Sequence, residues 1–292
     1  MKNRALSLIF LPLFLSCQDY GKLTIKANLP RTLAEVSGNA TVPGSDKLYA
    51  LNDGGNENHL YALDSLGNIV QELIIAGSKN KDWEDLASDP YGNLYIGDFG
   101  NNENDRRKFT IYTVENVLQY QKEIDTAFAK ATHFRLPDQE KKPKRNRYTD
   151  KDFEALIVYK NNFYIFSKNH LKDFDGTTRV YRIPAQQGEF IAEAMGSFKT
   201  CDDPDDCFVT AAALNATQDR LVLLTHDKVF LITQFNDQDF FSGRIQKKKL
   251  KHRSQKEGIA FKNDSIVFIT DERRAQTGGN LYTFSLQKNK NK

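Results

Sequence analysis

The sequence is short of several features, and each shortage excludes a class of protein. No apolar run reaches the roughly 18 residues of a membrane-spanning helix, so a multi-pass membrane protein is excluded. Charges nearly balance, with 41 Lys and Arg against 38 Asp and Glu, so we expect no nucleic-acid partner. The three cysteines lack the second pair or nearby histidine that would complete a structural zinc site.

Motifs of several enzyme classes are also missing. The chain has no glycine-rich phosphate loop before a helix, no Gly-x-Ser-x-Gly elbow and no His-Glu-x-x-His pair. What it does have is 20 Phe and 12 Tyr against only eight Pro. That composition argues against disorder and favours β structure. At about 150 residues per domain, the length allows one large domain or two ordinary ones.

The first segment has the form of an export signal. Lys2 and Arg4 precede an apolar stretch over 5–16, and a serine ends that stretch just before Cys17. A small residue before a cysteine at this place resembles the lipobox of bacterial lipoproteins, in which the cysteine is acylated. We therefore predict a lipoprotein signal peptide over 1–17, with a lipid on Cys17 that anchors the protein to a membrane. An ordinary secretory signal or a membrane-packed first helix is the alternative.

Two cysteines remain if Cys17 carries a lipid. Cys201 and Cys207 lie six positions apart, and export would place them in an oxidising compartment. We therefore predict a local disulfide between them. The loop that it closes is short, so it stabilises the fold by about 2 kcal/mol at most. Its expected use is to pin an acidic turn around Pro204.

A repeated pattern runs through the rest of the chain. Five segments combine an acidic or polar residue with small and aliphatic residues, and they begin at Glu35, Trp83, Phe153, Val209 and Lys256. Alternating strands separated by turn residues follow each segment. Four-stranded units that recur about every 50 residues are typical of β-propeller blades. The sequence therefore predicts an all-β fold, a β-propeller of five four-stranded blades over 22–286, with six blades as the alternative.

Ring closure and an insertion complete the predicted organisation. The fifth unit lacks a fourth strand, and the N-terminal segment 22–28 could supply it and so remove an exposed edge. A helical and basic insertion is expected at 115–152, with a short helix over Glu115–Lys130. Its basic stretch, Glu140–Arg147, is expected to be a loop on one rim. Residues 287–292 are expected to form a disordered tail.

Acidic residues recur where the first strand of each blade would line the central channel. Glu35, Glu84, Glu154 and Glu257 stand at corresponding places in four units, with Thr210 in the fifth. Converging carboxylates raise one another's pKa or are neutralised by a cation. Ca²⁺ takes about six to eight oxygen ligands, so a ring of Glu suits it. The same residues could instead fasten neighbouring blades or act in catalysis.

A second polar set follows the second strands of the units. Its members are Asn52, Asp53, Asp98, Asn169, His170, His226, Asp227, Asp271 and Glu272. The sequence leaves open whether this set reaches the same face as the glutamates. His170 and His226 could each present a general base on a loop, or could simply be solvated.

Four segments together resemble a known group of proteins: Leu-Tyr-Ala-Leu-Asn-Asp-Gly-Gly-Asn (48–56), Trp-Glu-Asp-Leu-Ala (83–87), Leu-Tyr-Ile-Gly-Asp-Phe-Gly-Asn-Asn (94–102) and Glu-Gly-Ile-Ala (257–260). They are similar to exported bacterial propellers of the SdiA-regulated lipoprotein and phytase-like esterase families. More distantly, they resemble the paraoxonase, gluconolactonase and strictosidine-synthase propellers. The resemblance spans most of 30–286.

This resemblance implies a propeller and suggests a metal site. Calcium-dependent hydrolases of that neighbourhood hold a channel metal with a first-strand Glu and with Asn or Asp from other blades. By position, the resemblance implies Glu84 or Glu257 as ligands, together with Asn52 and Asp98.

Three functions fit these observations. The first is a lipid-anchored propeller of the cell envelope, in the outer membrane of a Gram-negative bacterium, that binds a small ligand or protein partner at its central funnel. The second is a calcium-dependent esterase, lactonase or phosphatase that uses the Glu and Asp residues of the funnel. The third is a scaffold protein recruited through its rim loops.

Overall fold

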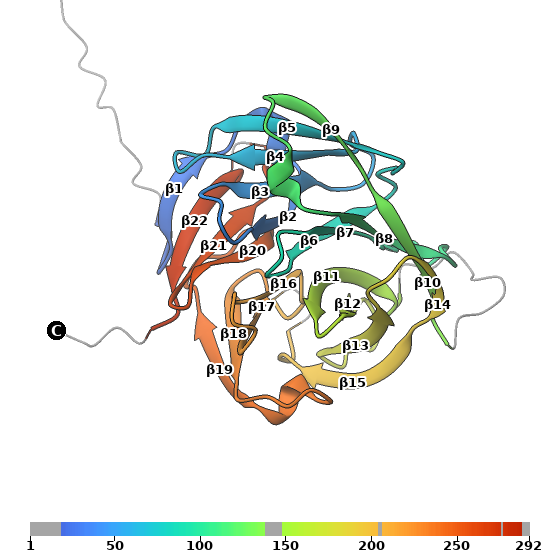
Figure 1. The fold of residues 1–292 in the computed structure, drawn as a ribbon. Coiled ribbons are helices and arrows are strands. Elements are labelled where there is room, and N and C mark those ends of the chain that lie inside the picture. The colour runs from blue at the N-terminus through green and yellow to red at the C-terminus, as the bar shows by residue number, and fades with distance from the viewer. Residues whose placement is uncertain (1–18, 138–147, 204–205, 276, 288–292) are drawn as a thin grey trace, which may run out of the picture.

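The computed structural model describes residues 19–137, 148–203, 206–275 and 277–287. Its strands form five separate sheets, which lie around a central axis (Figure 1). The first strands of the sheets lie near the axis and the last strands lie on the outside (Figure 1). The fold is therefore a five-bladed β-propeller, as the sequence predicts, and the described residues form no sixth blade.

The first three blades follow the chain from the axis outward. Blade 1 is β2 (Val36–Thr41), β3 (Leu48–Asn52), β4 (His59–Leu63), β5 (Ile69–Ala76) and β9 (Ile124–Phe128). Blade 2 is β6 (Trp83–Ser88), β7 (Leu94–Asp98), β8 (Phe109–Val114), β10 (Lys130–Arg135) and β14 (Gly188–Ile191). Blade 3 is β11 (Asp152–Tyr159), β12 (Asn162–Lys168), β13 (Thr177–Pro184) and β15 (Glu193–Lys199).

The last two blades are four-stranded. Blade 4 is β16 (Ala211–Leu214), β17 (Arg220–Leu224), β18 (Lys228–Thr233) and β19 (Arg244–Lys249). Blade 5 is β20 (Lys256–Asn263), β21 (Ile266–Asp271), β22 (Asn280–Ser285) and β1 (Thr24–Asn28). Short 3-10 turns lie at η1 (Arg31–Leu33), η2 (Val117–Gln119) and η3 (Phe240–Ser242). The described residues contain no helix that is long and apolar enough to cross a membrane.

The hydrophobic core is divided into layers between neighbouring blades. One buried cluster joins Tyr49 and Leu60 of blade 1 to Trp83 of blade 2, and further clusters fill the other four interfaces. Every residue of β3 and β7 is buried, because these strands are covered on both faces. This explains why their sequences are nearly continuous apolar runs.

The N-terminal strand closes the ring. Strand β1 pairs antiparallel with β22, with Thr24 opposite Thr283 and Asn28 opposite Asn280. The sequence predicts this closure, which gives the last blade its fourth strand from the opposite end of the chain. Pairing of the two chain ends removes the free edge that an unclosed β22 would present.

The insertion after β8 differs from the prediction. The prediction of a short helix over Glu115–Lys130 is wrong, because this stretch contains only the 3-10 turn η2 and then β9. Strand β9 pairs in parallel with β5 of the preceding blade. The edge of β5 offers unpaired backbone groups, and a strand satisfies them where a helix could not. The predicted basic loop Glu140–Arg147 lies outside the described residues.

Blade 3 likewise sends a strand to the edge of the preceding blade. After β13 the chain forms β14, which pairs in parallel with β10 of blade 2, and then returns to blade 3 as β15. Two neighbouring pairs of blades are thus joined by backbone hydrogen bonds as well as by side-chain packing.

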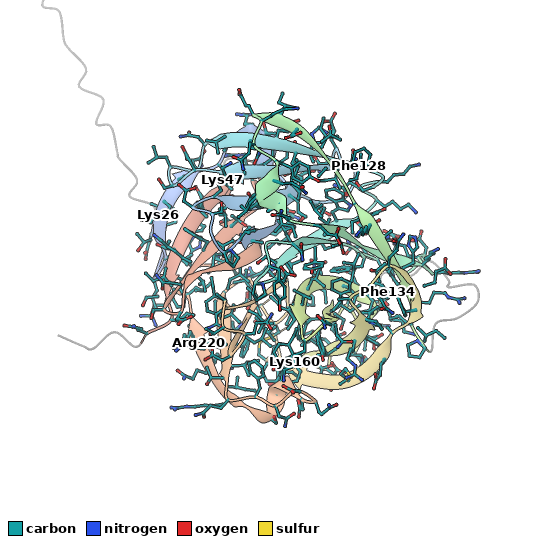
Figure 2. The ribbon with its side chains drawn as sticks, in the orientation of Figure 1. Lys26, Lys47, Phe128, Phe134, Lys160 and Arg220 are labelled. Atoms are coloured by element: carbon teal, nitrogen blue, oxygen red, sulfur yellow. A yellow bond between two sulfur atoms is a disulfide. The ribbon has the colours of Figure 1, made fainter. Side chains whose placement is uncertain are left out.

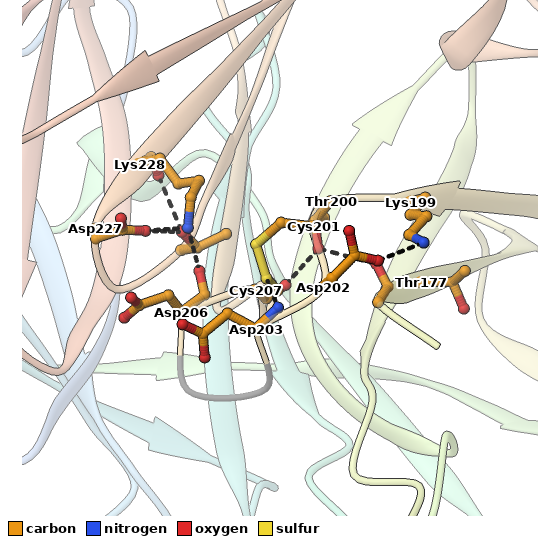
Figure 3. The surroundings of a disulfide bond; sticks show 12 residues. Thr177, Lys199, Thr200, Cys201, Asp202, Asp203, Asp206, Cys207, Asp227 and Lys228 are labelled. Atoms are coloured by element: carbon orange, nitrogen blue, oxygen red, sulfur yellow. Dashed lines mark hydrogen bonds and ion pairs between the residues drawn. A yellow bond between two sulfur atoms is a disulfide. The ribbon is translucent and has the colours of Figure 1, made fainter. Parts of the chain in front are cut away.

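The predicted disulfide between Cys201 and Cys207 is present (Figure 3). It lies in the connection from β15 of blade 3 to β16 of blade 4. Thr200 Oγ1 donates to the Cys207 carbonyl oxygen at 2.7 Å, and Lys228 Nζ donates to the Asp206 carbonyl oxygen at 2.7 Å (Figure 3). The disulfide loop is therefore tied to blade 4. Pro204 and Cys17 lie outside the described residues.

Candidate functional site

A β-bulge stands near the start of the first strand in four blades. The pairing register shifts between Val36 and Gly38, Trp83 and Asp85, Phe153 and Ala155, and Lys256 and Gly258. The extra residue of a bulge drops out of the ladder, so its side chain is aimed differently from its neighbours. These extra residues are Ser37, Glu84, Glu154 and Glu257. Thr210 precedes β16 at the corresponding place in blade 4.

The positions of the bulges show which residue of blade 1 corresponds to Glu84. Val36 pairs with Asn52 just as Trp83 pairs with Asp98, so Ser37 is the counterpart of Glu84. Glu35 lies two residues earlier, lies at the surface, and accepts a hydrogen bond from Asn56 Nδ2 at 2.6 Å. The prediction that Glu35 belongs to the ring is therefore wrong. The sequence comparison matched Glu35 to Glu84 by charge, whereas the β-bulge in the backbone matches Ser37 to Glu84.

Second strands end where first strands begin, so both polar sets reach the same face. We call this end of the axis the axial mouth; it is formed by the bulged residues, the residues just before the first strands and the residues just after the second strands. At the axial mouth, Lys168 Nζ contacts Glu154 Oε1 at 2.7 Å. Burial alone would lower the pKa of Lys168, but the carboxylates of Glu154 and Glu257 raise it well above its usual value. Glu154 is therefore already paired with a cation.

Glu257, another glutamate of the predicted ring, also has a partner. Burial raises the pKa of Glu257 well above its ordinary value, and the adjoining Glu272 carboxyl raises it further. The two carboxyls are hydrogen-bonded to each other. Such a pair holds a shared proton, because two like charges at hydrogen-bond distance cannot both ionise.

Glu84 belongs to a different cluster. Ligand oxygens of Asp53, Asp82 and Glu84 all lie within 4.8 Å of one another. Asp53 follows β3, Asp82 precedes β6, and Glu84 is the bulged residue of β6. Glu84 is 4% exposed, and within the described chain neither its carboxylate nor that of Asp82 has a hydrogen-bond or ion-pair partner. We call these three residues the acidic triad.

Burial and like charge perturb the triad strongly. Burial and then the Asp53 carboxylate raise the pKa of Asp82 to about 7. Burial, followed by Glu154 and Asp53, raises the pKa of Glu84 well above its usual range. Groups of this kind either hold protons at neutral pH or are neutralised by a bound cation.

Two glycines let the backbone close over the triad. A Cβ added to Gly100 would lie 2.2 Å from Glu84 Oε1 and 2.5 Å from Asp82 Oδ2. A Cβ on Gly54 would lie 2.5 Å from Asp82 Oδ1. The loops after β3 and β7 therefore contact the carboxylates directly, and any side chain at these two positions would occupy the space around the oxygens.

The other expected ligands are engaged by other partners, although Asp98 adjoins the triad, where its Oδ1 accepts from Asp82 N at 3.1 Å. Asp98 is 1% exposed and forms an ion pair with Arg106 at 3.0 Å. Asn52 donates from Nδ2 to the Thr32 carbonyl oxygen at 2.7 Å. The structure thus gathers carboxylate oxygens of Glu84, Asp53 and Asp82, with Asp98 beside them in an ion pair to Arg106. Asp82 was not among the ligands predicted from the sequence, although it stands two residues before Glu84.

The two loop histidines have different surroundings. His170 Nε2 lies 3.3 Å from Asp152 Oδ2, and its ring centroid lies 4.7 Å from that of Phe208. The backbone carbonyl of His226 accepts from Lys256 Nζ at 3.0 Å. Asp152 is close enough to the triad to raise the pKa of both Asp82 and Glu84. His170 therefore lies at the same mouth, beside a fully buried carboxylate with which it forms no hydrogen bond.

Asp85, which belongs to neither predicted polar set, closes the axis below the mouth. It is fully buried, and its Oδ2 accepts from Leu156 N of blade 3 at 2.8 Å and from Ala212 N of blade 4 at 3.3 Å. Burial raises its pKa well above the ordinary value, although these backbone donors oppose that shift. Below it the channel narrows to a space of about 20 Å³. The triad therefore opens to one face of the propeller only.

No protein-family description matches this chain, and no curated protein matches it in sequence. Among solved structures it is similar to the PQQ-bound aldose sugar dehydrogenase of Streptomyces coelicolor, with a TM-score of 0.50 and 11% identity over 90% of this chain and 97% of that one. It is also similar to a gluconolactonase of Xanthomonas campestris, with a TM-score of 0.45 and 12% identity over 87% and 73%.

Identities this low establish the fold alone. The chain is thus a five-bladed β-propeller with an acidic triad that could hold a metal ion at one end of its axis.

Proposed function

We propose that this protein binds a divalent cation, calcium, at the acidic triad and uses it to hold a ligand at the axial mouth. The observation that carries the proposal is the gathering of Asp53, Asp82 and Glu84 within 4.8 Å. Two of these carboxylates have no partner in the described chain, and Glu84 is almost fully buried. A buried carboxylate without a compensating partner is costly, and a cation offsets that cost.

Calcium suits this donor set better than zinc or magnesium. Every donor of the triad is a carboxylate oxygen, which hard cations prefer, and no thiol or imidazole takes part. Calcium accepts irregular geometry and a larger number of oxygens than magnesium does. Three carboxylates would leave coordination positions for solvent or for an oxygen of a ligand. The mouth around them is acidic, so a neutral or anionic ligand would bind through the cation.

A second candidate function is hydrolysis, and the pairing of His170 with Asp152 favours it. When bound, a cation of this kind polarises a carbonyl or phosphoryl oxygen. His170 Nε2 lies 3.3 Å from Asp152 Oδ2 without a hydrogen bond. A small rotation of the ring would form that bond and leave its other nitrogen to move a proton. Glu84→Gln would then abolish turnover of ester or lactone substrates, whereas a binding protein would show no turnover to lose.

The proposed cellular setting is the envelope of a Gram-negative bacterium. A disulfide between Cys201 and Cys207 fits an oxidising compartment outside the cytoplasm. The lipobox-like segment that ends at Cys17 would add a lipid anchor in the outer membrane. Labelling of the expressed protein with a fatty-acid analogue, lost in Cys17→Ser, tests that part separately.

A thermal melt tests the cation. We expect the protein in millimolar Ca²⁺ to melt at a clearly higher temperature than the protein in EDTA. A ligand at 100 times its Kd that binds only the folded state stabilises it by about 2.7 kcal/mol. Glu84→Gln should lose this shift. Glu35→Gln is the matched control, because Glu35 lies near the same mouth but outside the triad, and it should keep the shift. An equal shift in all three proteins would contradict the proposal.

A further inference from the structure

A cavity lies at the opposite end of the axis from the triad. It has a volume of about 710 Å³ and is lined by the turns that follow the first strands of blades 1, 2, 4 and 5. From there it continues outward between blades 5 and 1. Pockets that hold small molecules have volumes of about 300–1,000 Å³, so the cavity is large enough for a ligand of that size.

Apolar side chains form its inner wall. Val42 and Leu48 of blade 1 face Phe261, Phe268 and Leu281 of blade 5. Four of the five are buried, and Phe268 is half-buried. This wall continues the hydrophobic layer between the two blades. It is therefore suited to an apolar chain or ring rather than to a solvated polar ligand.

Three lysines stand around this wall. Lys47 directly precedes β3, Lys262 lies near the end of β20, and Lys26 lies on β1. All three line the cavity, and Lys26 and Lys47 lie on the neighbouring sides of blades 5 and 1 (Figure 2). None of the three forms an ion pair with any residue that the structure describes. Lys262 Nζ lies 5.6 Å from the centroid of the Phe268 ring, and Lys47 Nζ makes a long hydrogen bond of 3.4 Å to Gln71.

The aspartates of the lining are mostly engaged by their own turns. Asp64 and Asp89 each accept from backbone N–H groups and from an asparagine side chain. Asp264 accepts from Asn215 Nδ2 at 2.9 Å. Asp46 lies on the rim. Within the described residues, no ion pair therefore joins these aspartates to the three lysines, and an anion would displace only the long contact of Lys47 with Gln71 and the contact of Lys262 with the Phe268 ring.

We propose that this cavity binds an amphiphilic anion, a molecule with an apolar chain and a single carboxylate. The apolar wall would take the chain, and the ammonium groups of Lys47 and Lys262 would bind the carboxylate by charge-assisted hydrogen bonds. The site is independent of the acidic triad, because the narrow channel closed by Asp85 separates the two ends of the axis.

Calorimetric titration of the purified protein with dodecanoate, below its micelle concentration, tests the proposal. We expect saturable binding of one molecule. The double variant Lys47→Gln and Lys262→Gln should weaken the Kd by about tenfold or more, the usual value of a hydrogen bond to a charged group. Dodecanol, which lacks the charge, should bind more weakly by a similar factor.

The chain offers a matched control for this variant. Lys247 on the outer strand β19 also lies over a phenylalanine ring, 5.9 Å from the centroid of Phe230, but it is not part of the lining of this cavity. Lys247→Gln with Lys249→Gln removes the same charge and should leave the Kd unchanged, as should Asp82→Asn at the triad. The proposal is overturned if dodecanoate shows no saturable binding, if the control pair weakens it equally, or if dodecanol binds as tightly.

Discussion

Asp82 holds a proton at a pH at which an ordinary aspartate has lost it. Its pKa is raised from 3.8 to about 7, first by burial and then by Asp53. Between these two values the folded protein keeps a proton that the unfolded chain has released. Raising the pH across this window therefore lowers the free energy of unfolding, by up to roughly 4 kcal/mol from this group. Above about pH 7 the group adds no further change.

Asp82→Asn should remove that pH dependence. Measured in EDTA by urea unfolding, with the fluorescence of Trp83 as the signal, we expect the variant to be more stable than the parent at about pH 8. The difference should shrink as the pH falls toward about 3, below both pKa values, where the carboxyl is mostly protonated in both states. A difference that does not change with pH would show that Asp82 does not titrate as the geometry requires.

Three residues show why the site was only partly predictable at this scale. Glu84 was predictable because a repeated acid at the start of a first strand suggests the channel. Asp85 was predictable in principle, because its counterparts in the other four blades are Gly38, Ala155, Ala211 and Gly258. A lone acid among glycines and alanines at a crowded axis marks a special contact. Asp82 was not predictable, because it joins the triad only through the way the loops that contain Gly54 and Gly100 fold over its carboxylate.

At the scale of the element, β9 joins two blades through both its backbone and its side chains. Ala127 is fully buried in the same cluster as Trp83, whereas the next residue, Phe128, is 77% exposed at the outer edge (Figure 2). The sequence of this segment carries apolar residues at helical spacing, which is why it predicts a helix. Its strand conformation depends on the edge of β5, about 50 residues away, and no local pattern contains that information.

A pair of adjacent variants tests whether β9 is part of the core. Ala127→Asp places an unpaired charge in a buried layer and should lower the free energy of unfolding by more than about 3 kcal/mol. Phe128→Asp, one residue on and facing solvent, should change it by less than about 0.5 kcal/mol. Urea unfolding followed by Trp83 fluorescence measures both. Equal effects would mean that β9 is a detached edge strand.

At the scale of the whole molecule, the repeat predicts the ring and its closure correctly. Blade count follows from the five recurring motifs, and the pairing of β1 with β22 follows from a missing strand at one end and a spare one at the other. The cavity between blades 5 and 1 was not predictable, because its walls come from turns that are distant in sequence. What the ring produces is a molecule with two chemically distinct ends, an acidic mouth and a cavity that has an apolar inner wall and both lysines and aspartates in its lining.

The most direct test of the acidic mouth uses the single tryptophan of the chain. Trp83 is fully buried and precedes Glu84, so it should transfer energy to Tb³⁺ bound at the triad in place of Ca²⁺. We predict saturable terbium emission on tryptophan excitation that Ca²⁺ displaces, that Glu84→Gln abolishes and that Glu35→Gln retains. Absence of sensitised emission in the parent protein, or its survival in Glu84→Gln, would contradict a cation centre at Asp53, Asp82 and Glu84.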